Sequence, residues 1–289
     1  MKKAFASAFK ICAGIGVDHG AGNLIIHQSR SSLVEKKAVI QVRDLVAKYG
    51  DEVILDRVSF DVHAGEIFAV LGGSGSGKST LLKHLIGLVQ PHSGRIMIDG
   101  DDITGCEENK LQKILRKVGV LYQSSALLGS MTIAENVALP ISEYTNLSPE
   151  SVNNLVKMKL HLVQLDGYEN HLPSEISGGM KKRAGLARAM ALNPKILFFD
   201  EPSAGLDPVT SAELDKLILN LNQNLKTTMV IVTHELQSIF AVAHRVVMLH
   251  KSNRGIIASG DPRYLKDHSR NPFVKQFFNR LTADNLQSD

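Results

Sequence analysis

The sequence predicts one α/β domain that carries an all-helical insert. Short apolar strand patterns alternate with amphipathic helix patterns along most of the chain, as in domains that cover a sheet with helices. The strand patterns stop between about residues 124 and 192, where only helix patterns occur. The length of 289 residues and the 44% hydrophobic content suit one large domain with an ample core.

The first part of the chain has the pattern of strands. Apolar and polar residues alternate in AVIQVRDLVAKYG and again in VILDRVSFDVHAGE. The apolar segment IFAVL then leads into a glycine-rich loop and a helix. The segment SGRIMIDGDDI predicts a hairpin with its turn at Asp99 and Gly100, and KVGVLYQ predicts a buried strand that ends at Gln123.

Helix signals and further strands fill the rest of the chain. The capping box TIAE begins a helix at Thr132, and Ser148 followed by Pro149 begins another. An amphipathic helix is expected in PVTSAELDKLILNLNQN, where leucine and isoleucine recur at i, i+3, i+4 and i+7 from Leu214. The segments KILFFDEP, TMVIVTHE and RVVMLH predict buried strands.

The loop GGSGSGKS fits the pattern G-x-x-x-x-G-K-[ST] and lies between a predicted strand and a predicted helix, as this pattern requires. Its glycines let backbone N–H groups surround a β-phosphate, and the helix start favours negative charge. Lys78 supplies a positive charge to the β and γ oxygens, the Ser79 hydroxyl can bind Mg²⁺, and Thr80 can reach the α-phosphate. The predicted ATP-binding residues of this loop are Gly72, Gly73, Ser74, Gly75, Ser76, Gly77, Lys78, Ser79 and Thr80.

Two carboxylates, Asp200 and Glu201, end the apolar strand ILFF. We expect Asp200 to hold Mg²⁺ through its water shell and Glu201 to polarise the attacking water. A solvated strand end is the alternative for an isolated Asp-Glu pair. The glycine-rich loop upstream favours the catalytic interpretation.

From about Val39 to Gly260 the chain resembles the ATP-binding-cassette (ABC) transporter ATPases. Besides the two motifs above, ISGGM at 176–180 matches the family's signature, which is usually Leu-Ser-Gly-Gly-Gln. The resemblance implies a P-loop NTPase fold of the ABC type, with an antiparallel β subdomain and a helical insert. In the family two subunits pair head to tail, and the signature of one closes over the γ-phosphate held by the other. This contact across the dimer is implied for Ser177, Gly178, Gly179 and Met180.

Four further positions match the family one by one. Tyr49 stands where an aromatic ring stacks on adenine, and Gln123 matches the Q-loop glutamine, which senses Mg²⁺ and the attacking water. Asp207 matches the D-loop aspartate at the dimer interface, and His234 matches the switch histidine that contacts the γ-phosphate. The resemblance implies Glu201, His234, Gln123 and Lys78 as catalytic residues, and Ser79, Gln123 and Asp200 as Mg²⁺ ligands.

Three cations, Lys181, Lys182 and Arg183, follow the signature glycines at the expected start of a helix. A helix start carries partial positive charge and disfavours cations. The arrangement is explained if an anion occupies this helix start, as the family's shared ATP site implies. A solvated basic face is the alternative for the two lysines. Met180 replaces the usual glutamine at a position that points towards the sugar of the nucleotide, so it need not abolish activity.

Several segments are similar to the cassette subunits of lipid-trafficking transporters of the maintenance-of-lipid-asymmetry and mammalian-cell-entry type. They are ISGGMKKRAGLARAMALNP, DEPSAGLDPVTSAELDKLI and YQSSALLGSMTIAENVALPI. This likeness implies that ATP hydrolysis drives phospholipid trafficking between inner and outer membranes. Leu127, Leu128 and Met131 are then sockets for a permease's coupling helix, or alternatively part of the local core of the insert.

The implied assembly is a homodimer of ATPase subunits, bound peripherally to an integral membrane permease on the cytoplasmic side of the inner membrane. A periplasmic lipid-binding protein and a small regulatory protein of the STAS (sulfate-transporter/anti-sigma-antagonist) type are further implied partners. The expected cofactors are ATP and Mg²⁺. The sequence has no run of about 18 apolar residues, the length that a membrane-spanning helix needs.

The predicted boundaries are an N-terminal extension at 1–36, an ABC ATP-binding domain at 37–262 with the helical subdomain at about 124–192, and a C-terminal helical tail at 263–289. The first residues faintly resemble a secretory signal, but Lys10 interrupts their apolar run, so we interpret them as an extension. In the tail, Phe273, Phe277 and Leu281 form one apolar stripe that docks on the same subunit or on its dimer mate.

Two other function classes stay open. One is a cassette for another importer or exporter, for example for amino acids. The other is a non-transport cassette that acts on nucleic acid or ribosomes; such proteins usually carry two cassettes in one chain, or long coiled-coil or zinc inserts, which this sequence lacks. The balance of 33 basic and 29 acidic side chains gives no indication of a nucleic-acid partner.

Overall fold

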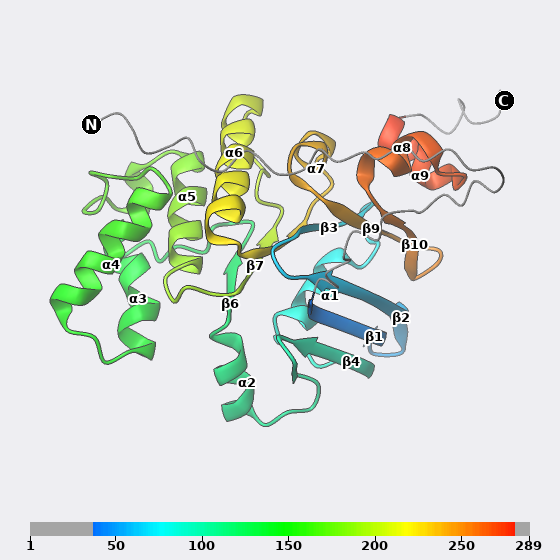
Figure 1. The fold of residues 1–289 in the computed structure, drawn as a ribbon, viewed down its shortest axis with the longest axis horizontal. Coiled ribbons are helices and arrows are strands. Elements are labelled where there is room, and N and C mark those ends of the chain that lie inside the picture. Colours follow the sequence, from blue (N-terminus) through cyan, green and yellow to red (C-terminus); the bar gives the residue numbers. More distant parts are fainter. Residues whose placement is uncertain (1–36, 281–289) are drawn as a thin grey trace, which may run out of the picture. The chain divides into compact units, whose positions relative to one another are not determined.

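The computed structural model describes residues 37–280, which form an α/β unit with two sheets (Figure 1). The strands are β1 (Ala38–Tyr49), β2 (Glu52–His63), β3 (Ile67–Gly72), β4 (Ser93–Ile98), β5 (Asp101–Asp102), β6 (Val118–Leu121), β7 (Ile196–Asp200), β8 (Thr228–Val232), β9 (Arg245–His250) and β10 (Gly255–Gly260). The helices are α1 (Lys78–Leu85), α2 (Glu108–Leu115), α3 (Ile133–Tyr144), α4 (Pro149–Leu162), the short η1 (Pro173–Glu175), α5 (Gly178–Ala189), α6 (Pro208–Leu225), α7 (Leu236–Val242), α8 (Pro262–His268) and α9 (Pro272–Asn279). The predicted extension at 1–36 and Leu281 of the predicted tail lie outside the described residues.

The larger sheet has the strand order β10-β9-β3-β8-β7-β6. Its strands run parallel except for β10, which pairs antiparallel with β9. The carboxyl ends of β3, β6, β7 and β8 therefore lie at one edge of the sheet. The glycine-rich loop and the segments with Gln123, Glu201 and His234 follow these strand ends, so the fold brings them to that edge.

The smaller sheet is antiparallel, in the order β2-β1-β4-β5. Its last turn is the predicted pair Asp99 and Gly100, whose φ angles are +49° and +86°. Such turns favour these residue types because they tolerate positive φ. The Asp99 carboxylate also pairs with Lys117 at 3.2 Å and with Lys195 at 2.7 Å, which precede β6 and β7. One side chain thus belongs to the hairpin turn and also ties the smaller sheet to the larger one.

Alternate residues of β3 supply three hydrophobic clusters. Phe68 and Val70 join the cluster that lies between the two sheets and α1. Ile67 joins a second cluster with α3, α4, α5 and α6. Ala69 and Leu71 join a third cluster with α7, α8 and α9. Because all six β3 residues are buried, this strand is common to every layer of the domain.

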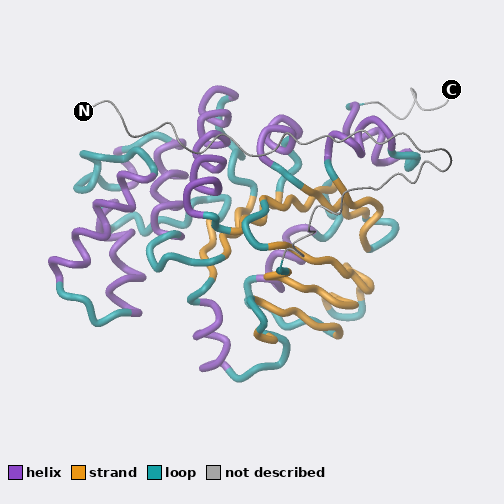
Figure 2. The backbone as a smooth tube through the Cα atoms, viewed as in Figure 1, coloured by secondary structure: helices purple, strands orange, loops and turns teal. Residues whose placement is uncertain are grey.

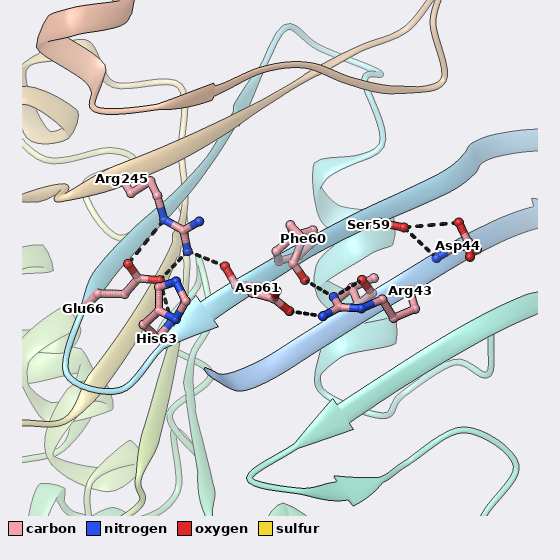
Figure 3. A network of polar contacts seen from close by, with 9 residues as sticks. Arg43, Asp44, Ser59, Phe60, Asp61, His63, Glu66 and Arg245 are labelled. Atoms are coloured by element: carbon pink, nitrogen blue, oxygen red, sulfur yellow. Dashed lines mark hydrogen bonds and ion pairs between the residues drawn. The ribbon is translucent and has the colours of Figure 1, made fainter. Parts of the chain in front are cut away.

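A network of charged side chains joins the sheets near the amino ends of β3 and β9 (Figure 3). Arg245 pairs with Glu66 at 2.7 Å and donates a hydrogen bond to the backbone oxygen of Asp61 in β2. The Asp61 carboxylate pairs in turn with Arg43 of β1 at 2.7 Å. The Arg245 guanidinium also lies over the ring of Phe68, 5.0 Å from its centroid. These contacts fix the smaller sheet against the strand that precedes the glycine-rich loop.

The segment between β6 and β7 is helical and contains α3, α4 and α5 (Figure 2). The predicted capping box begins α3: the Glu135 N–H donates to Thr132 Oγ1, and the Glu135 carboxylate accepts from the Thr132 N–H. Ser148 is the N-cap of α4 and Pro149 its first residue, also as predicted. The structure thus confirms the predicted α/β fold with an antiparallel β part and a helical insert.

The last two helices pack on the same subunit. Val274 and Phe278 of α9 are buried and Phe277 is partly buried in the third hydrophobic cluster. Phe273 is 47% exposed, and the centroid of its ring lies 4.0 Å from that of the His250 ring. Phe277 of the predicted stripe therefore contacts the core, Phe273 does not, and the adjacent Val274 and Phe278 are the buried residues of α9. No helix between residues 37 and 280 has the length and apolar character needed to cross a membrane.

Candidate active site

Two glycines shape the loop that follows β3. Gly72 has a φ of +150°, and a Cβ at this position would collide with Ser76 Oγ. Gly77 has a φ of +94° at the N-cap of α1, and a Cβ there would lie 2.6 Å from Leu55 Cδ2. Glycine at both positions lets the loop close tightly and places Lys78 at the first turn of α1.

Lys78 lies over this loop. Its Nζ donates hydrogen bonds to the carbonyl oxygens of the loop's first two glycines, at 2.8 and 3.0 Å. Burial lowers the pKa of Lys78, and attraction by Glu201 and Asp200 opposes that shift. The buried Ser76 Oγ has no hydrogen-bond partner among the residues that the structure describes. A cation and the free N–H groups of a helix start together fit a phosphate group.

The end of β7 brings two carboxylates beside a histidine. Asp200 pairs with Val232 of β8, and the N–H of Glu201 donates to the Val232 carbonyl oxygen at 2.8 Å. Glu201 Oε1 lies 2.9 Å from His234 Nδ1. Burial raises the pKa of Asp200 and the adjacent Glu201 raises it further, while three nearby lysines oppose the shift. A bound cation would therefore stabilise the charged form of Asp200.

A cavity of about 540 Å³ opens beside these carboxylates. The residues that line it are Tyr122, Gln123, Ser124, Asp200, Ala204 and Gly205. Gln123, which follows β6, and Asp200, which ends β7, thus line the same cavity. Their amide and carboxylate oxygens suit a hard cation such as Mg²⁺. Within residues 37–280 no group of three or more His, Cys, Asp or Glu side chains could hold a metal alone, so phosphate and water would complete such a site.

The signature segment begins α5. Ser177 is the N-cap, as predicted, and its Oγ accepts a hydrogen bond from the Met180 N–H at 3.3 Å. Ser177 and Gly178 are exposed, whereas a Cβ on the buried Gly179 would collide with Thr210 Cγ2 of α6. Met180 is partly buried against the core of the helical insert. The first two residues are therefore open to a ligand, and the contact of Met180 with a nucleotide stays a prediction.

Two of the three cations after the signature, Lys182 and Arg183, have partners within the chain. Lys182 is only 5% exposed, and its Nζ donates to the carbonyl oxygens of Gln123 at 2.6 Å and Glu201 at 3.4 Å. The solvated face is therefore wrong for Lys182, whereas an anion at the helix start stays a prediction. Arg183 pairs with Glu213 of α6 at 3.0 Å. Tertiary contacts with the strand ends and with α6 place these charges here.

Two predicted residues lie at other element ends. Tyr49 ends β1 and is 49% exposed. Asp207 is the N-cap of α6 and accepts hydrogen bonds from the N–H groups of Val209 and Thr210, at 3.0 Å each. The hydrogen bond from the Thr210 hydroxyl does most to lower the pKa of Asp207, and these backbone hydrogen bonds lower it further. Asp207 thus has a clear structural role, and its place at a dimer interface stays a prediction.

Sequence reasoning did not find the residues that hold the turn after Gln123. Arg188 of α5 donates hydrogen bonds to the carbonyl oxygens of Ser125 and Ala126. Its spacing from Lys182 and from the glycine between them, three residues at each step, was the available signal. Such spacing indicates a helix face that closely approaches another segment.

Known proteins are similar to this chain in sequence and in fold. The profile of the ABC transporter family matches residues 55–204. The probable ribonucleotide transport ATP-binding protein mkl of Mycobacterium leprae is 43% identical over 240 residues, which are 83% of this chain and 68% of that protein. For the Mycobacterium bovis mkl protein the covered share is 66%, so the chain spans about two thirds of these relatives. The intermembrane phospholipid transport system ATP-binding protein MlaF of Escherichia coli K12 is 38% identical over 243 residues, 84% of this chain and 89% of that protein.

Two solved structures share the architecture. The ATP-binding cassette MJ0796, a dimer in a post-hydrolysis state bound to ADP and Pi, has a TM-score of 0.70 at 30% identity and covers 77% of this chain and 98% of its own. CbiO1 from Clostridium perfringens, part of the ABC transporter complex cbiONQ, has a TM-score of 0.74 at 27% identity, with 80% and 91% covered. With its glycine-rich loop, paired carboxylates and signature helix, the chain belongs to the ABC transporter family as an ATPase subunit that uses ATP and Mg²⁺.

Proposed function

We propose that ATP hydrolysis by this chain drives the movement of phospholipid between an inner and an outer membrane. The likeness to MlaF proteins carries the proposal, because the chain covers 85% of the Haemophilus influenzae protein at 39% identity and 89% of the Escherichia coli protein at 38%. The mkl relatives are 43% identical but covered over only 66–68% of their length. Their name makes ribonucleotides the second candidate cargo.

In the proposed site the glycine-rich loop and Lys78 hold the phosphates, and Tyr49 stacks on the adenine. Glu201 accepts a proton from the attacking water. His234, whose Nδ1 lies 2.9 Å from the Glu201 carboxylate, holds that carboxylate in place. Mg²⁺, when bound, offsets the negative charge of the phosphates. The residues proposed to hold it are Ser79, Gln123 and Asp200.

A second copy of the chain completes the site in this proposal. Ser177 and Gly178 are exposed at the start of α5, where the N–H groups and the dipole of the helix favour an anion. The MJ0796 cassette, with 30% identity, is a dimer with ADP and Pi. We infer that this helix start binds the γ-phosphate held by the other subunit, with Gly179 and Met180 behind it and Asp207 at the interface.

The helical insert offers a surface for a permease. Leu128 is 43% exposed and Met131 partly exposed in the turn before α3, whereas Leu127 packs against the core of the insert. We infer that Leu128 and Met131 contact the coupling helix of an integral membrane permease, on the cytoplasmic side of the inner membrane. A periplasmic lipid-binding protein and a STAS-type regulatory protein are the further proposed partners.

Affinity isolation of the tagged full chain from membranes tests the cargo. Mass spectrometry should identify a permease and bound phospholipid, and phospholipid vesicles should stimulate the ATPase of the isolated complex. Stimulation by ribonucleotides, without bound lipid, would instead favour the second candidate. Stimulation by neither would refute both assignments of cargo.

Two substitutions test the site itself. Glu201→Gln should retain ATP binding and trap a closed dimer, with hydrolysis lower by about 100-fold or more, the scale of general-base catalysis. Lys78→Ala should weaken nucleotide binding. Glu143→Gln, at an exposed position of α3, is the matched control for the first variant. Wild-type turnover in Glu201→Gln would exclude Glu201 as the base, and unchanged affinity in Lys78→Ala would exclude the proposed loop contact.

A further inference from the structure

One face of α5 packs closely against the segment that follows β6 and donates hydrogen bonds to it. Lys182, Gly185 and Arg188 are spaced three residues apart and lie on this face. The Arg188 guanidinium donates hydrogen bonds to the carbonyl oxygens of Ala126 at 2.7 Å and Ser125 at 3.2 Å. A Cβ at Gly185 would lie only 3.1 Å from the Ser125 carbonyl oxygen. The helix therefore approaches this segment closely because residue 185 is glycine.

Lys182 extends these contacts to the sheet edge at which Gln123 and Glu201 lie. Its side chain is buried, and its Nζ donates to the Gln123 carbonyl oxygen at 2.6 Å and to the Glu201 carbonyl oxygen at 3.4 Å. Gln123 follows β6 and Glu201 follows β7. A single ammonium group therefore joins the signature helix to two strand ends.

Both acceptors are main-chain atoms, so these hydrogen bonds restrain the backbone of Gln123 and Glu201. Glu201 has a φ of +46°, a region that a glutamate backbone occupies only when its surroundings hold it there. Three contacts hold its main chain. The Lys182 ammonium at 3.4 Å and the Ala204 N–H at 3.1 Å donate to the Glu201 carbonyl oxygen, and the Glu201 N–H donates to the Val232 carbonyl oxygen at 2.8 Å. Burial lowers the pKa of Lys182, and attraction by Asp200 and Glu201 opposes that shift.

We propose that Lys182 is a positioning residue that fixes the start of α5 relative to the main chain of Gln123 and Glu201. A displacement of the helical insert then changes the direction of the Glu201 carboxylate. The proposal rests on the site assignment above and adds a route by which the insert controls hydrolysis. Loss of the ammonium group should affect the chemical step more than nucleotide binding, because Lys78 and its loop are not altered.

The test is Lys182→Met in the full-length chain, with kcat, the Kd for a non-hydrolysable ATP analogue and the Tm as readouts. Methionine keeps most of the apolar stem but leaves the Gln123 and Glu201 carbonyl oxygens without the Lys182 donor, so the Tm should fall by a few degrees. We expect kcat to fall about tenfold, which corresponds to about 1.4 kcal/mol of activation free energy. The Kd should stay within about twofold. Lys182→Arg keeps the charge and the N–H donors and should recover kcat to within about threefold of wild type.

Lys157→Met, at an exposed position of α4, controls for the loss of any lysine of the insert and should leave kcat unchanged. Three outcomes would overturn the proposal: normal kcat in folded Lys182→Met, a Kd that rises in step with the fall in kcat, or a Lys182→Arg protein as slow as Lys182→Met. If the Met variant does not fold, Lys182→Gln is judged on the same outcomes. Glu201→Gln is measured in parallel. Normal turnover there refutes the site assignment, whereas lost turnover there with normal turnover in Lys182→Met refutes only the positioning role.

Discussion

Replacement of Asn136 by alanine should loosen the turn that precedes α3. Asn136 lies in α3 and is 0% exposed. Its Oδ1 accepts a hydrogen bond from the Leu128 N–H at 2.8 Å. Its Nδ2 lies 3.1 Å from the carbonyl oxygens of Leu128 and Met131, and 3.0 Å from that of Thr132. This one amide therefore holds the turn that presents Leu128 and Met131 at the surface of the insert.

The cost follows from the number of bonds that the amide can form. Two N–H donors and one accepted bond give at most three well-formed hydrogen bonds among the four contacts. At about 1 kcal/mol for each bond, Asn136→Ala should lower the free energy of unfolding by about 3 kcal/mol. For a domain of this size, the Tm should fall by about 6–12 °C. ATPase activity of the isolated subunit should change little, because these hydrogen bonds of Asn136 run to the turn alone.

Calorimetry and urea unfolding measure the stability, and hydrogen exchange reports on the Leu128 amide, which should lose protection. Asn154→Ala, at an exposed position of α4, is the matched control and should shift the free energy of unfolding by less than about 0.5 kcal/mol. The reasoning is refuted if Asn136→Ala costs less than about 1 kcal/mol and the Leu128 amide stays protected.

Two further substitutions test contacts that hold the sheets. Ion pairs, most strongly the one with Lys195, lower the pKa of Asp99 below its usual 3.8. These pairs therefore stabilise the fold above pH 3.8, and the stabilisation is lost as the pH falls through the lower folded-state pKa. Asp99→Asn should therefore have a lower Tm than wild type at pH 7, and a difference that does not shrink on acidification below pH 3.8 would contradict this. At Gly119 of β6 a Cβ would collide with the Ala189 carbonyl oxygen, so Gly119→Ala should cost about 3 kcal/mol in urea unfolding. Gly129→Ala, where a Cβ meets nothing within 4 Å, should be nearly neutral, and equal costs for the two variants would refute the expected clash.

Features set by neighbouring residues in the chain could be predicted from the sequence. The Asp99-Gly100 turn depends on two residues that tolerate positive φ, and the Thr132 and Ser177 caps depend on side chains that accept a hydrogen bond from a nearby backbone N–H. The glycine-rich loop was predictable for the same reason, since the positive φ of Gly77 is a local requirement. These local signals located the segments that meet at the catalytic edge.

Features set by contacts between distant segments could not be predicted. The burial of Lys182 depends on the carbonyl oxygens of Gln123 and Glu201, which the sequence does not place near α5. The buried face of the tail helix could not be predicted for a different reason. Phe273 and Phe277 lie next to a second apolar pair, Val274 and Phe278, at the same spacing. Two adjacent stripes give one hydrophobic helix face, and only the core against which it packs decides its rotation.

β3 is central in space but early in the chain. Its partners on both sides, β8 and β9, begin only at Thr228 and Arg245, after the helical insert and α6. During synthesis on the ribosome, both edges of this apolar strand therefore stay unpaired until most of the domain has been made, and such edges invite wrong pairing. The growing chain should gain affinity for ATP late, once β9 has emerged. A shortened chain that ends before β8 would carry the glycine-rich loop without the strands that hold it in place.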